Sequence, residues 1–385
     1  MNTPTVLSRR SCARIRAREG LAKWGHATGL ETRLGLSALA AGLVFGLGVT
    51  GHARAADEKQ FQGITLRVGT WGGATRDGMR DYVAGEFEKR GGKVEFVIGS
   101  PQDNFAKVVA SRGRPVVDVL NFQANMVPEI LGRNLLLKLN LQNVPNTRAL
   151  RADQYNEFMV ATWNTQEMII YNKDKFRDNQ LAPPESLADL RNPKLAGRVL
   201  VPDISSGAGI EAVGAFALTA GGNEQNIDPG LRLIREIPGV RFWRAGGEVV
   251  TQFKSGDIWV AVAHAGWAVR AAHAGVPVAA VPARIGNHRG IVAEAYMGVI
   301  RGSPNQEAAE FFVNTMVSAD AQYGFAIKTG IVPVNQEARS RLSRVPVVKD
   351  LVVLDQGRID NMVRLDPARI DLGRWNEQWN RMISQ

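Results

Sequence analysis

The segment Arg198–Gly222 (RVLVPDISSGAGIEAVGAFALTAGG) has the pattern of a buried strand followed by an amphipathic helix. The apolar run 199–201 predicts the strand, and the sequence Ser205-Ser206-Gly207 predicts the start of the helix. Backbone N–H groups at a helix N-terminus attract anionic or carbonyl oxygens, so this turn is a candidate ligand site. The alternative is that Ser205 and Ser206 only cap the helix, which contributes about 1 kcal/mol to stability.

Strand and helix patterns also alternate in the residues before this segment. Alternating apolar residues at 64–68 lead into the sequence GTWGG at 69–73, and a helix pattern follows. Further strands are predicted at 94–98 and 116–120, each followed by a helix, which indicates an α/β fold with a parallel sheet. Ligands bind beyond the carboxyl ends of strands in such sheets. The residues that this rule makes candidates are Thr70, Trp71, Gly72, Gln123 and Asn125. An alternative role for Trp71 is packing, because tryptophan side chains are largely buried in most proteins.

The N-terminus has the pattern of an export signal. Residues 34–50 carry no charge, follow a basic segment, and lead to the small-residue sequence Ala53-Arg54-Ala55. We therefore predict a signal peptide at 1–55 that is cleaved before Ala56, and a periplasmic location for the mature protein. A retained membrane anchor is the alternative, but the apolar run is short and rich in glycine and alanine.

Removal of residues 1–55 changes the charge and the cysteine content. The whole chain has a net charge of +10, of which the predicted signal holds +6, so the remainder keeps about +4. The only cysteine, Cys12, also lies in the signal. We find no basic run interleaved with aromatic residues, so we expect no nucleic-acid partner. A disulfide or a cysteine metal site is excluded for the mature chain.

The rest of the chain continues the α/β pattern to its end. Strands are predicted at 168–171, 258–263, 276–281 and 293–300, and helices at 186–190, 228–237, 248–254, 265–274, 305–317, 319–327 and 372–382. About 330 residues are too many for one compact core of ordinary size, which predicts two lobes. Because no low-complexity linker interrupts the pattern, strands must join the lobes.

Motifs of catalysis are missing from the sequence. The histidines after the signal are His264, His273 and His288, and none has the spacing of a zinc helix or of a serine-hydrolase elbow. No dinucleotide or phosphate-loop fingerprint is present, so we expect no cofactor, no metal and no enzymatic activity. A hydrolase that pairs Ser205 or Ser206 with His264 is the alternative, because triads can assemble from distant residues.

Seven segments in order resemble the extracellular solute-binding proteins of ABC importers, in particular the spermidine/putrescine-binding branch. They are LRVGTWGG, VVDVLNFQANM, MIIYNKDKF, SLADLRNPKLAGRVLVPD, the run from FKSGDIWVAVAHAGW to PARIG, AYMGVIRGSPNQEAAEFFVNTMVSADAQ and TGIVPVNQEA. The resemblance implies a two-lobe fold, in which each lobe has a mostly parallel sheet flanked by helices. It also implies two crossover strands, near Ala161–Glu167 and Ala293–Gly298, that act as a hinge.

The same resemblance implies domain bounds and partners. Lobe 1 would comprise 56–163 plus 296–340, lobe 2 would comprise 164–295, and the helical segment 341–385 is assigned to neither lobe. The protein would be a monomer that captures a small polar solute between its lobes and delivers it to an inner-membrane ABC permease.

The resemblance also implies site residues, with informative departures. Trp71 matches a family aromatic residue and Asp203 matches a family acid, whereas Ser206 stands where a second acid is expected. His264 replaces a family tryptophan, and Glu294 and Tyr296 lie where the returning crossover carries an acid. A site that has serines and Gly207 in place of carboxylates suits an organic anion or an amino-acid-like zwitterion better than a polyamine. Ferric ion is a further alternative, although only Tyr323 lies where ferric binders have adjacent tyrosines.

Overall fold

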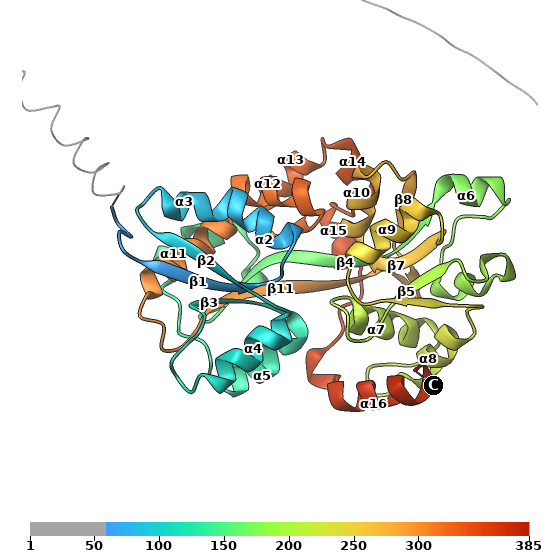
Figure 1. The fold of residues 1–385 in the computed structure, drawn as a ribbon, viewed down its shortest axis with the longest axis horizontal. Coiled ribbons are helices and arrows are strands. Elements are labelled where there is room, and N and C mark those ends of the chain that lie inside the picture. Colours follow the sequence, from blue (N-terminus) through green and yellow to red (C-terminus); the bar gives the residue numbers. More distant parts are fainter. Residues whose placement is uncertain (1–58, 385) are drawn as a thin grey trace, which may run out of the picture. The chain divides into compact units, whose positions relative to one another are not determined.

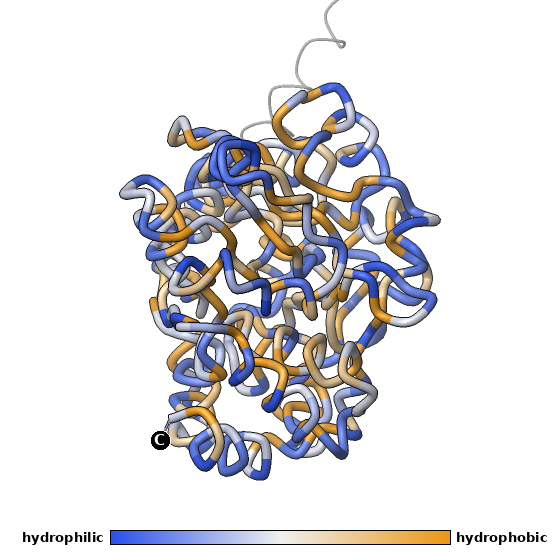
Figure 2. The backbone as a smooth tube through the Cα atoms, turned by 90° about the vertical axis from the view of Figure 1, so that its right-hand side faces the viewer, coloured by the Kyte–Doolittle hydropathy of each residue, from blue (hydrophilic) through white to orange (hydrophobic). Residues whose placement is uncertain are grey.

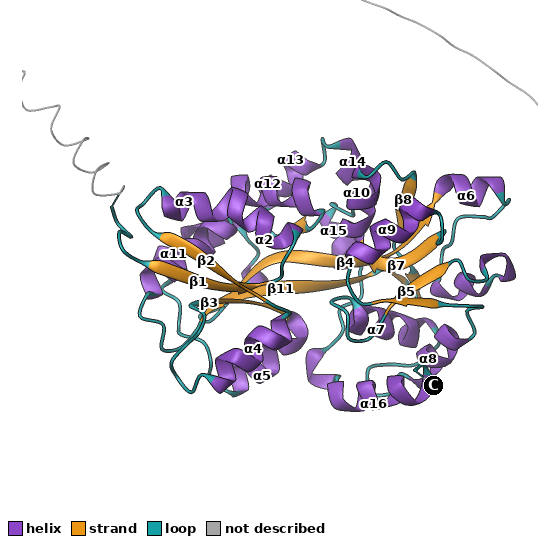
Figure 3. Ribbon diagram, viewed as in Figure 1, coloured by secondary structure: helices purple, strands orange, loops and turns teal. Residues whose placement is uncertain are grey.

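The computed structural model describes residues 59–384, so the predicted signal peptide lies outside the described residues. Strands and helices alternate along most of this range (Figure 3). The strands are β1 (Thr65–Thr70), β2 (Lys93–Ile98), β3 (Val119–Gln123), β4 (Val160–Asn172), β5 (Val199–Pro202), β6 (Arg241–Trp243), β7 (Val260–His264), β8 (Val278–Val281), β9 (Arg284–Ile285), β10 (His288–Arg289), β11 (Ile291–Val299) and β12 (Val332–Pro333).

Two long strands in the middle of the sheet connect its two ends. The strand order is β2-β1-β3-β11-β4-β7-β5-β6, and β8 and β12 also pair with β4. The pairs β1–β2, β1–β3, β5–β6 and β5–β7 are parallel, whereas β4 and β11 pair antiparallel to each other. We call the half that contains β1–β3 lobe 1 and the half that contains β5–β8 lobe 2. The predicted two-lobe α/β fold with two crossover strands is confirmed, and β4 and β11 are those strands.

Helices cover both faces of the sheet (Figure 1). In that view α2, α3, α10 and α12 lie above the strands, and α4, α5, α7, α8 and α16 lie below them. The helices are α2 (Ala74–Met79), α3 (Gly85–Glu88), α4 (Pro101–Ala110), α5 (Val127–Gly132), α6 (Lys173–Asp178), α7 (Gly209–Thr219), α8 (Asp228–Arg235), α9 (Gly247–Ser255), α10 (Ala265–His273), α11 (Gln306–Met316), α12 (Ala319–Thr329), α13 (Gln336–Leu342), α14 (Pro346–Leu351), α15 (Gln356–Asp360) and α16 (Leu372–Met382).

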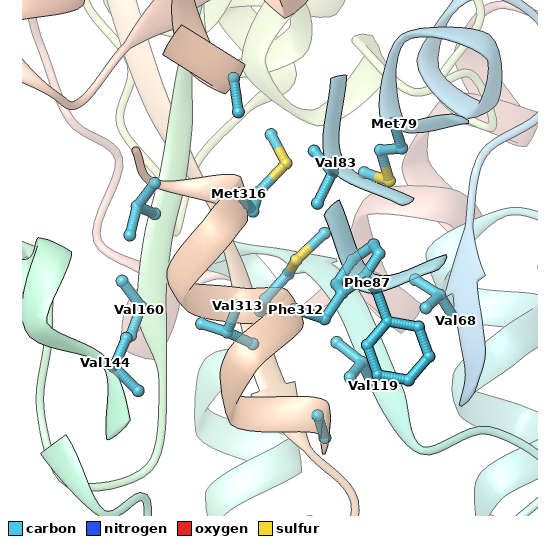
Figure 4. Packing of buried hydrophobic residues seen from close by; sticks show 14 of the residues in the cluster. Val68, Met79, Val83, Phe87, Val119, Val144, Val160, Phe312, Val313 and Met316 are labelled. Carbon is cyan, nitrogen blue, oxygen red and sulfur yellow. The ribbon is translucent and has the colours of Figure 1, made fainter. Parts of the chain in front are cut away.

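The hydrophobic core follows the two lobes. In lobe 1, side chains of β1, β3, α3 and α11 pack together, including Phe87 and Phe312, which are fully buried (Figure 4). In lobe 2, α16 packs through Trp375 and Trp379 against the cluster that contains residues of β5 and α7. The indole N–H of Trp375 donates to the carbonyl of Glu224 at 2.9 Å. The outer loops are largely hydrophilic (Figure 2). Burial of these aromatic side chains is a main source of stability, because each removes a large apolar area from water.

The chain after Leu342 packs on lobe 2. Leu342, Val348 and Leu351 belong to the cluster that contains residues of β7, α9 and α10, and α16 belongs to the cluster around β5 and α7. The sequence left this segment without an assignment. No helix among the described residues is long and apolar enough to cross a membrane.

Three local predictions differ from the structure. The third strand is β3 at Val119–Gln123 and not 116–120, so Gln123 belongs to the strand and not to the loop after it. The helix predicted at 186–190 is a short 3-10 turn, Leu187–Arg191. Helix α7 begins at Gly209 with Ala208 at its N-cap, so neither Ser205 nor Ser206 caps it.

Candidate ligand-binding cleft

A cavity of about 470 Å³ lies between the lobes, where the parallel strands of both lobes end. Its lining includes the segments that follow β1, β2, β5, β6 and β7, together with the last residue of β3. The crossover strands contribute residues 163–166 of β4 and Glu294 and Ala295 of β11, which form its floor. The carboxyl ends of parallel strands gather at one edge of a sheet, and two such edges face each other here. The volume suits a small solute.

Four tryptophans line this cleft: Trp71, Trp163, Trp243 and Trp267. Trp163 and Trp243 are buried, and the indole N–H of Trp243 donates to the carbonyl of Val262 at 3.1 Å, so both are fixed parts of the wall. Trp71 is partly exposed and its ring lies 5.9 Å from that of Trp163. The packing and platform roles of Trp71 are therefore compatible, since the residue packs against the core cluster and also lines the cleft.

The turn between β5 and α7 reaches the cleft through Ser205, Ser206 and Gly207. Asp203 organises this turn, because one of its carboxylate oxygens accepts from both the backbone N–H of Ser205, at 2.9 Å, and its hydroxyl, at 2.6 Å. Across the cleft, the side-chain amide of Gln123 donates to the carbonyl of Gly207 at 3.0 Å. This bond links lobe 1 to lobe 2 directly.

Arg270 of α10 brings a positive charge into the cleft. Its guanidinium lies over the ring of Trp267, 4.2 Å from the ring centroid, and its buried Nε has no hydrogen-bond partner. No residue in 59–384 forms an ion pair or a hydrogen bond with this guanidinium. Burial lowers the pKa of Arg270 to about 10, so the side chain still carries its charge at neutral pH. An unpaired, partly buried guanidinium favours a carboxylate or another oxyanion as its partner.

Gly246 allows Trp267 to hold this position. A Cβ atom at Gly246 would lie 1.8 Å from a ring carbon of Trp267, so the indole packs directly on the glycine backbone. Trp267 therefore packs against both the backbone of Gly246 and the guanidinium of Arg270, and we call this arrangement the stack. The stack orients the planar guanidinium before any ligand arrives, which reduces the entropy lost on binding.

His264 lines the cleft next to the crossover strand. Its Nε2 atom lies 3.5 Å from a carboxylate oxygen of Glu167, which is directly opposite in the β4–β7 pairing. Burial, and to a smaller extent the charge of Arg270, lower the pKa of His264 to about 4. The imidazole is therefore neutral at physiological pH, and it offers hydrogen bonds rather than charge.

The two candidate acids, Glu294 and Asp203, are not free. Glu294 reaches the floor with a side chain that is 14% exposed, and it forms an ion pair with Arg364 at 3.2 Å. Asp203 faces a different hollow, where Arg244 lies 3.5 Å from its second oxygen. A polyamine site needs carboxylates that can pair with ammonium groups, and both of these acids already have cationic or hydroxyl partners.

The structure brings together most of the residues that the sequence singled out. Those that line the cleft are Trp71, Gly72, Gln123, Ser205, Ser206, Gly207, His264 and Glu294. Thr70, Asn125, Asp203 and Tyr296 do not line it. Thr70 is buried at the end of β1, and Asn125 faces a small separate cavity. Tyr296 stacks on Phe122, 6.1 Å between ring centroids, and burial followed by the charge of Glu294 raises its pKa to about 12.

Sequence reasoning missed Arg270, Trp267 and Glu167. A signal for the first two exists, because residues three apart on a helix share a face and α10 begins where β7 ends. Glu167 gave no such signal, since an acid in a strand is usually a solvated edge residue. No group of three or more histidine, cysteine or acidic side chains within 59–384 has the arrangement of a metal site.

Comparison with known proteins agrees with this architecture. A GABA receptor, Atu4243, is 22% identical, with a TM-score of 0.68, and the match covers 83% of this chain and 96% of that one. The protein AgtB of Agrobacterium tumefaciens R10, in complex with agropinic acid, is 20% identical, with a TM-score of 0.66 and coverage of 84% and 100%. A protein of Listeria monocytogenes described as a spermidine/putrescine ABC transporter is 19% identical, with a TM-score of 0.69 and coverage of 83% and 99%. At these identities the likeness concerns the fold.

A search of curated proteins gave no match. The family model for bacterial extracellular solute-binding proteins matches residues 83–350, which is more than half of the 385 residues. The chain belongs to the family of bacterial extracellular solute-binding proteins.

Proposed function

We propose that this protein captures a small organic anion or an amino-acid-like zwitterion in the interlobe cleft and delivers it to an inner-membrane ABC permease. The observation that carries the proposal is the unpaired guanidinium of Arg270 in the cleft, fixed on the ring of Trp267. A ligand carboxylate would neutralise this charge and complete its hydrogen bonds. The mature protein would work in the periplasm, and no bond of the solute would be made or broken.

The tryptophans and the polar groups would contact different parts of the solute. Trp71 and Trp267 would contact the carbon skeleton of the solute, because their rings are only partly buried and both line the cleft. The backbone and hydroxyl of Ser206, with Arg270, would meet its oxygens. A polyamine is the second candidate, since aromatic rings also suit methylene chains and cations. A polyamine would meet no unpaired carboxylate among the cleft-lining residues, because Glu294, the acid in that lining, forms an ion pair with Arg364.

Three four-carbon probes separate these ligand classes. Succinate has a carboxylate at both ends, 4-aminobutyrate has one carboxylate and one ammonium group, and putrescine has two ammonium groups. Calorimetric titration of the purified protein should show binding of succinate or 4-aminobutyrate and none of putrescine. Tighter binding of putrescine would overturn the ranking. Native mass spectrometry of freshly purified protein would identify a co-purified solute directly.

The role of Arg270 is tested by Arg270→Gln, which removes the charge but keeps a long polar side chain. We expect affinity for the better of the two carboxylate probes to fall by about 2 to 4 kcal/mol, because a buried, charge-assisted pair is lost. Arg244→Gln is the matched control, since Arg244 also lines the cleft but its side chain is 79% exposed and paired with Asp203. Equal losses in both variants would argue for general attraction and against a specific anchor.

A further inference from the structure

Glu167 and His264 form a buried pair directly beneath the cleft. They lie opposite each other in the antiparallel β4–β7 pairing, and Oε2 of Glu167 is 3.5 Å from Nε2 of His264. The side chain of Glu167 is 3% exposed and that of His264 is 16% exposed. Only His264 reaches the cleft, where it lies on the same side as Arg270. Through His264, the buried Glu167 can therefore influence the cleft without contacting a ligand.

Neither partner has another group to bond. Both carboxyl oxygens of Glu167 and Nε2 of His264 are buried without a hydrogen bond from any residue in 59–384. The charged groups that act on the pair are Glu211 of α7 and Arg270 of α10, and the β11 residue opposite Glu167 is the apolar Ile291. With no N–H donor in reach apart from the ring of His264, an ionised carboxylate here would be poorly solvated, which is costly.

These surroundings determine which partner holds a proton. Burial raises the pKa of Glu167 well above its usual range, and the neighbouring Glu211 carboxyl raises it further. The pKa of His264 is lowered to about 4, mainly by burial. Both shifts favour a carboxylic acid beside a neutral imidazole over an ion pair. A carboxylic acid has one O–H donor, and the unprotonated nitrogen of a neutral imidazole is an acceptor.

We propose that Glu167 is a specificity-determining residue: as a carboxylic acid it donates to Nε2 of His264 and so fixes the imidazole tautomer that presents Nδ1–H to an oxygen of the ligand. The 3.5 Å separation is long for such a bond, so the carboxyl group and the imidazole ring must approach each other slightly for it to form. Nδ1 is the nitrogen available to the cleft, because Nε2 is the buried one. Glu167 acts through His264 and does not touch the ligand.

The proposal deepens the proposed function and rests on it. Arg270 and Nδ1–H of His264 would be two donors on one side of the cleft, which fits the oxygens of a carboxylate. An ammonium group would meet an N–H donor there and no acceptor. This tautomer therefore favours a carboxylate over an ammonium group at this end of the ligand. The discrimination arises because an ammonium group would be left without a hydrogen-bond acceptor.

The tautomer can be measured without any ligand. Heteronuclear NMR of protein labelled at histidine distinguishes a protonated Nδ1 from a protonated Nε2. We expect His264 of the unliganded wild type to be neutral at about pH 7, with the proton on Nδ1. A proton on Nε2, or a doubly protonated ring at this pH, would overturn the proposal. His264→Gln serves to assign the signal.

A pH series of succinate affinity gives the second readout. Succinate keeps its charge between about pH 7 and about pH 9.5, so a change in affinity over this range reports the protein. As the pH rises through the pKa of Glu167, the carboxyl group ionises, the proton of His264 moves to Nε2, and a buried negative charge lies near the ligand. We expect the wild-type affinity to fall as Glu167 ionises.

Glu167→Gln separates this effect from a structural role. The amide has nearly the same shape and does not titrate, so the variant should bind succinate within about threefold of wild type near pH 7 and lose the alkaline fall. Glu211→Gln is the matched control, because Glu211 is buried but lies outside the cleft lining. Burial raises the pKa of Glu211 itself to about 7, and its charge raises the pKa of Glu167, so this variant should keep the fall with its midpoint moved to lower pH. An equal pH dependence in wild type and Glu167→Gln would overturn the proposal.

The two proposals can fail separately. If neither succinate nor 4-aminobutyrate binds the wild type, the anion-binding function fails, and the NMR measurement still decides the tautomer of His264. If succinate binds through Arg270 but His264 carries its proton on Nε2, the function stands and the role of Glu167 is refuted.

Discussion

At the scale of single residues, the charges in and beside the cleft differ in whether they are paired, and the proposed ligand class follows from this difference. Arg244, Asp203, Glu294 and Arg364 neutralise one another in two ion pairs, whereas Arg270 is left for a ligand. A count of charges along the sequence could not show this, because the partners are up to 70 residues apart. The unpaired charge is the informative one, since a partly buried cation without a partner costs stability that a ligand can restore.

Trp71 provides a prediction at the same scale. Trp71→Ala should weaken binding of a carboxylate probe by about 1 to 3 kcal/mol, because an aromatic contact in a desolvated pocket is lost. The unliganded melting temperature should fall only slightly, since Trp71 is partly exposed and packs at the margin of the core cluster. Calorimetry with parallel thermal melts measures both quantities. A large loss of unliganded stability with unchanged affinity would return Trp71 to a packing role alone.

At the scale of elements, the turn between β5 and α7 lines the cleft, and we expect it to contact the charged group of the ligand. Ser206 is buried and lines the cleft, and its hydroxyl accepts weakly from the N–H of Ala208 at 3.4 Å. We expect Ser206→Asp to reduce affinity for succinate by several kcal/mol, because two like charges would meet where the dielectric constant is low.

The same variant distinguishes the ligand classes. For putrescine the new carboxylate would supply a partner for ammonium, so binding should appear or tighten. Ser206→Ala is the control, since it removes the hydroxyl without adding charge. Calorimetric titration of both variants with the three four-carbon probes is the measurement. Unchanged affinity of Ser206→Asp for every probe that binds the wild type would remove this turn from the site.

The element boundaries show where sequence patterns work and where they do not. Helix α16 and strand β5 were predictable because their apolar residues follow helix and strand periodicity. Strand β3 was misplaced because Asn121 and Gln123 are polar yet buried, and their side chains bond to carbonyls of Tyr296 and Gly207 on other elements. Tertiary partners of this kind leave no periodic pattern in the local sequence. The start of α7 was misplaced for a similar reason, since Asp203 organises the turn that two serines seemed to cap.

At the scale of the described molecule, the sheet explains why the cleft lies where it does. Because β4 and β11 run through both lobes and pair with each other over seven residues, they form a continuous floor under the cleft. The register of this pair shifts between Ala295 and Tyr296, a local irregularity at the middle of the crossover. The order of strand and helix patterns made the two lobes predictable from sequence. The missing partner of Arg270 and the burial of Glu167 depend on tertiary packing around β4, β7 and α10, which the local sequence does not show.

The two-lobe fold predicts that ligand binding closes the cleft. In the structure a side-chain bond from Gln123 to the carbonyl of Gly207 already spans the cleft, and a solute between Arg270 and Trp71 would add contacts to both lobes. A ligand at about 100 times its dissociation constant adds about 2.7 kcal/mol to the folded state, so the melting temperature should rise. X-ray scattering should show a smaller radius of gyration at the same concentration.

Gln123→Leu removes the bridging bond, and we expect it to widen the scattering difference between the free and the bound protein, because the unliganded cleft would open further. Stabilisation by ligand with no change in the radius of gyration of either protein would count against closure and would assign the solute to a cleft that is already formed.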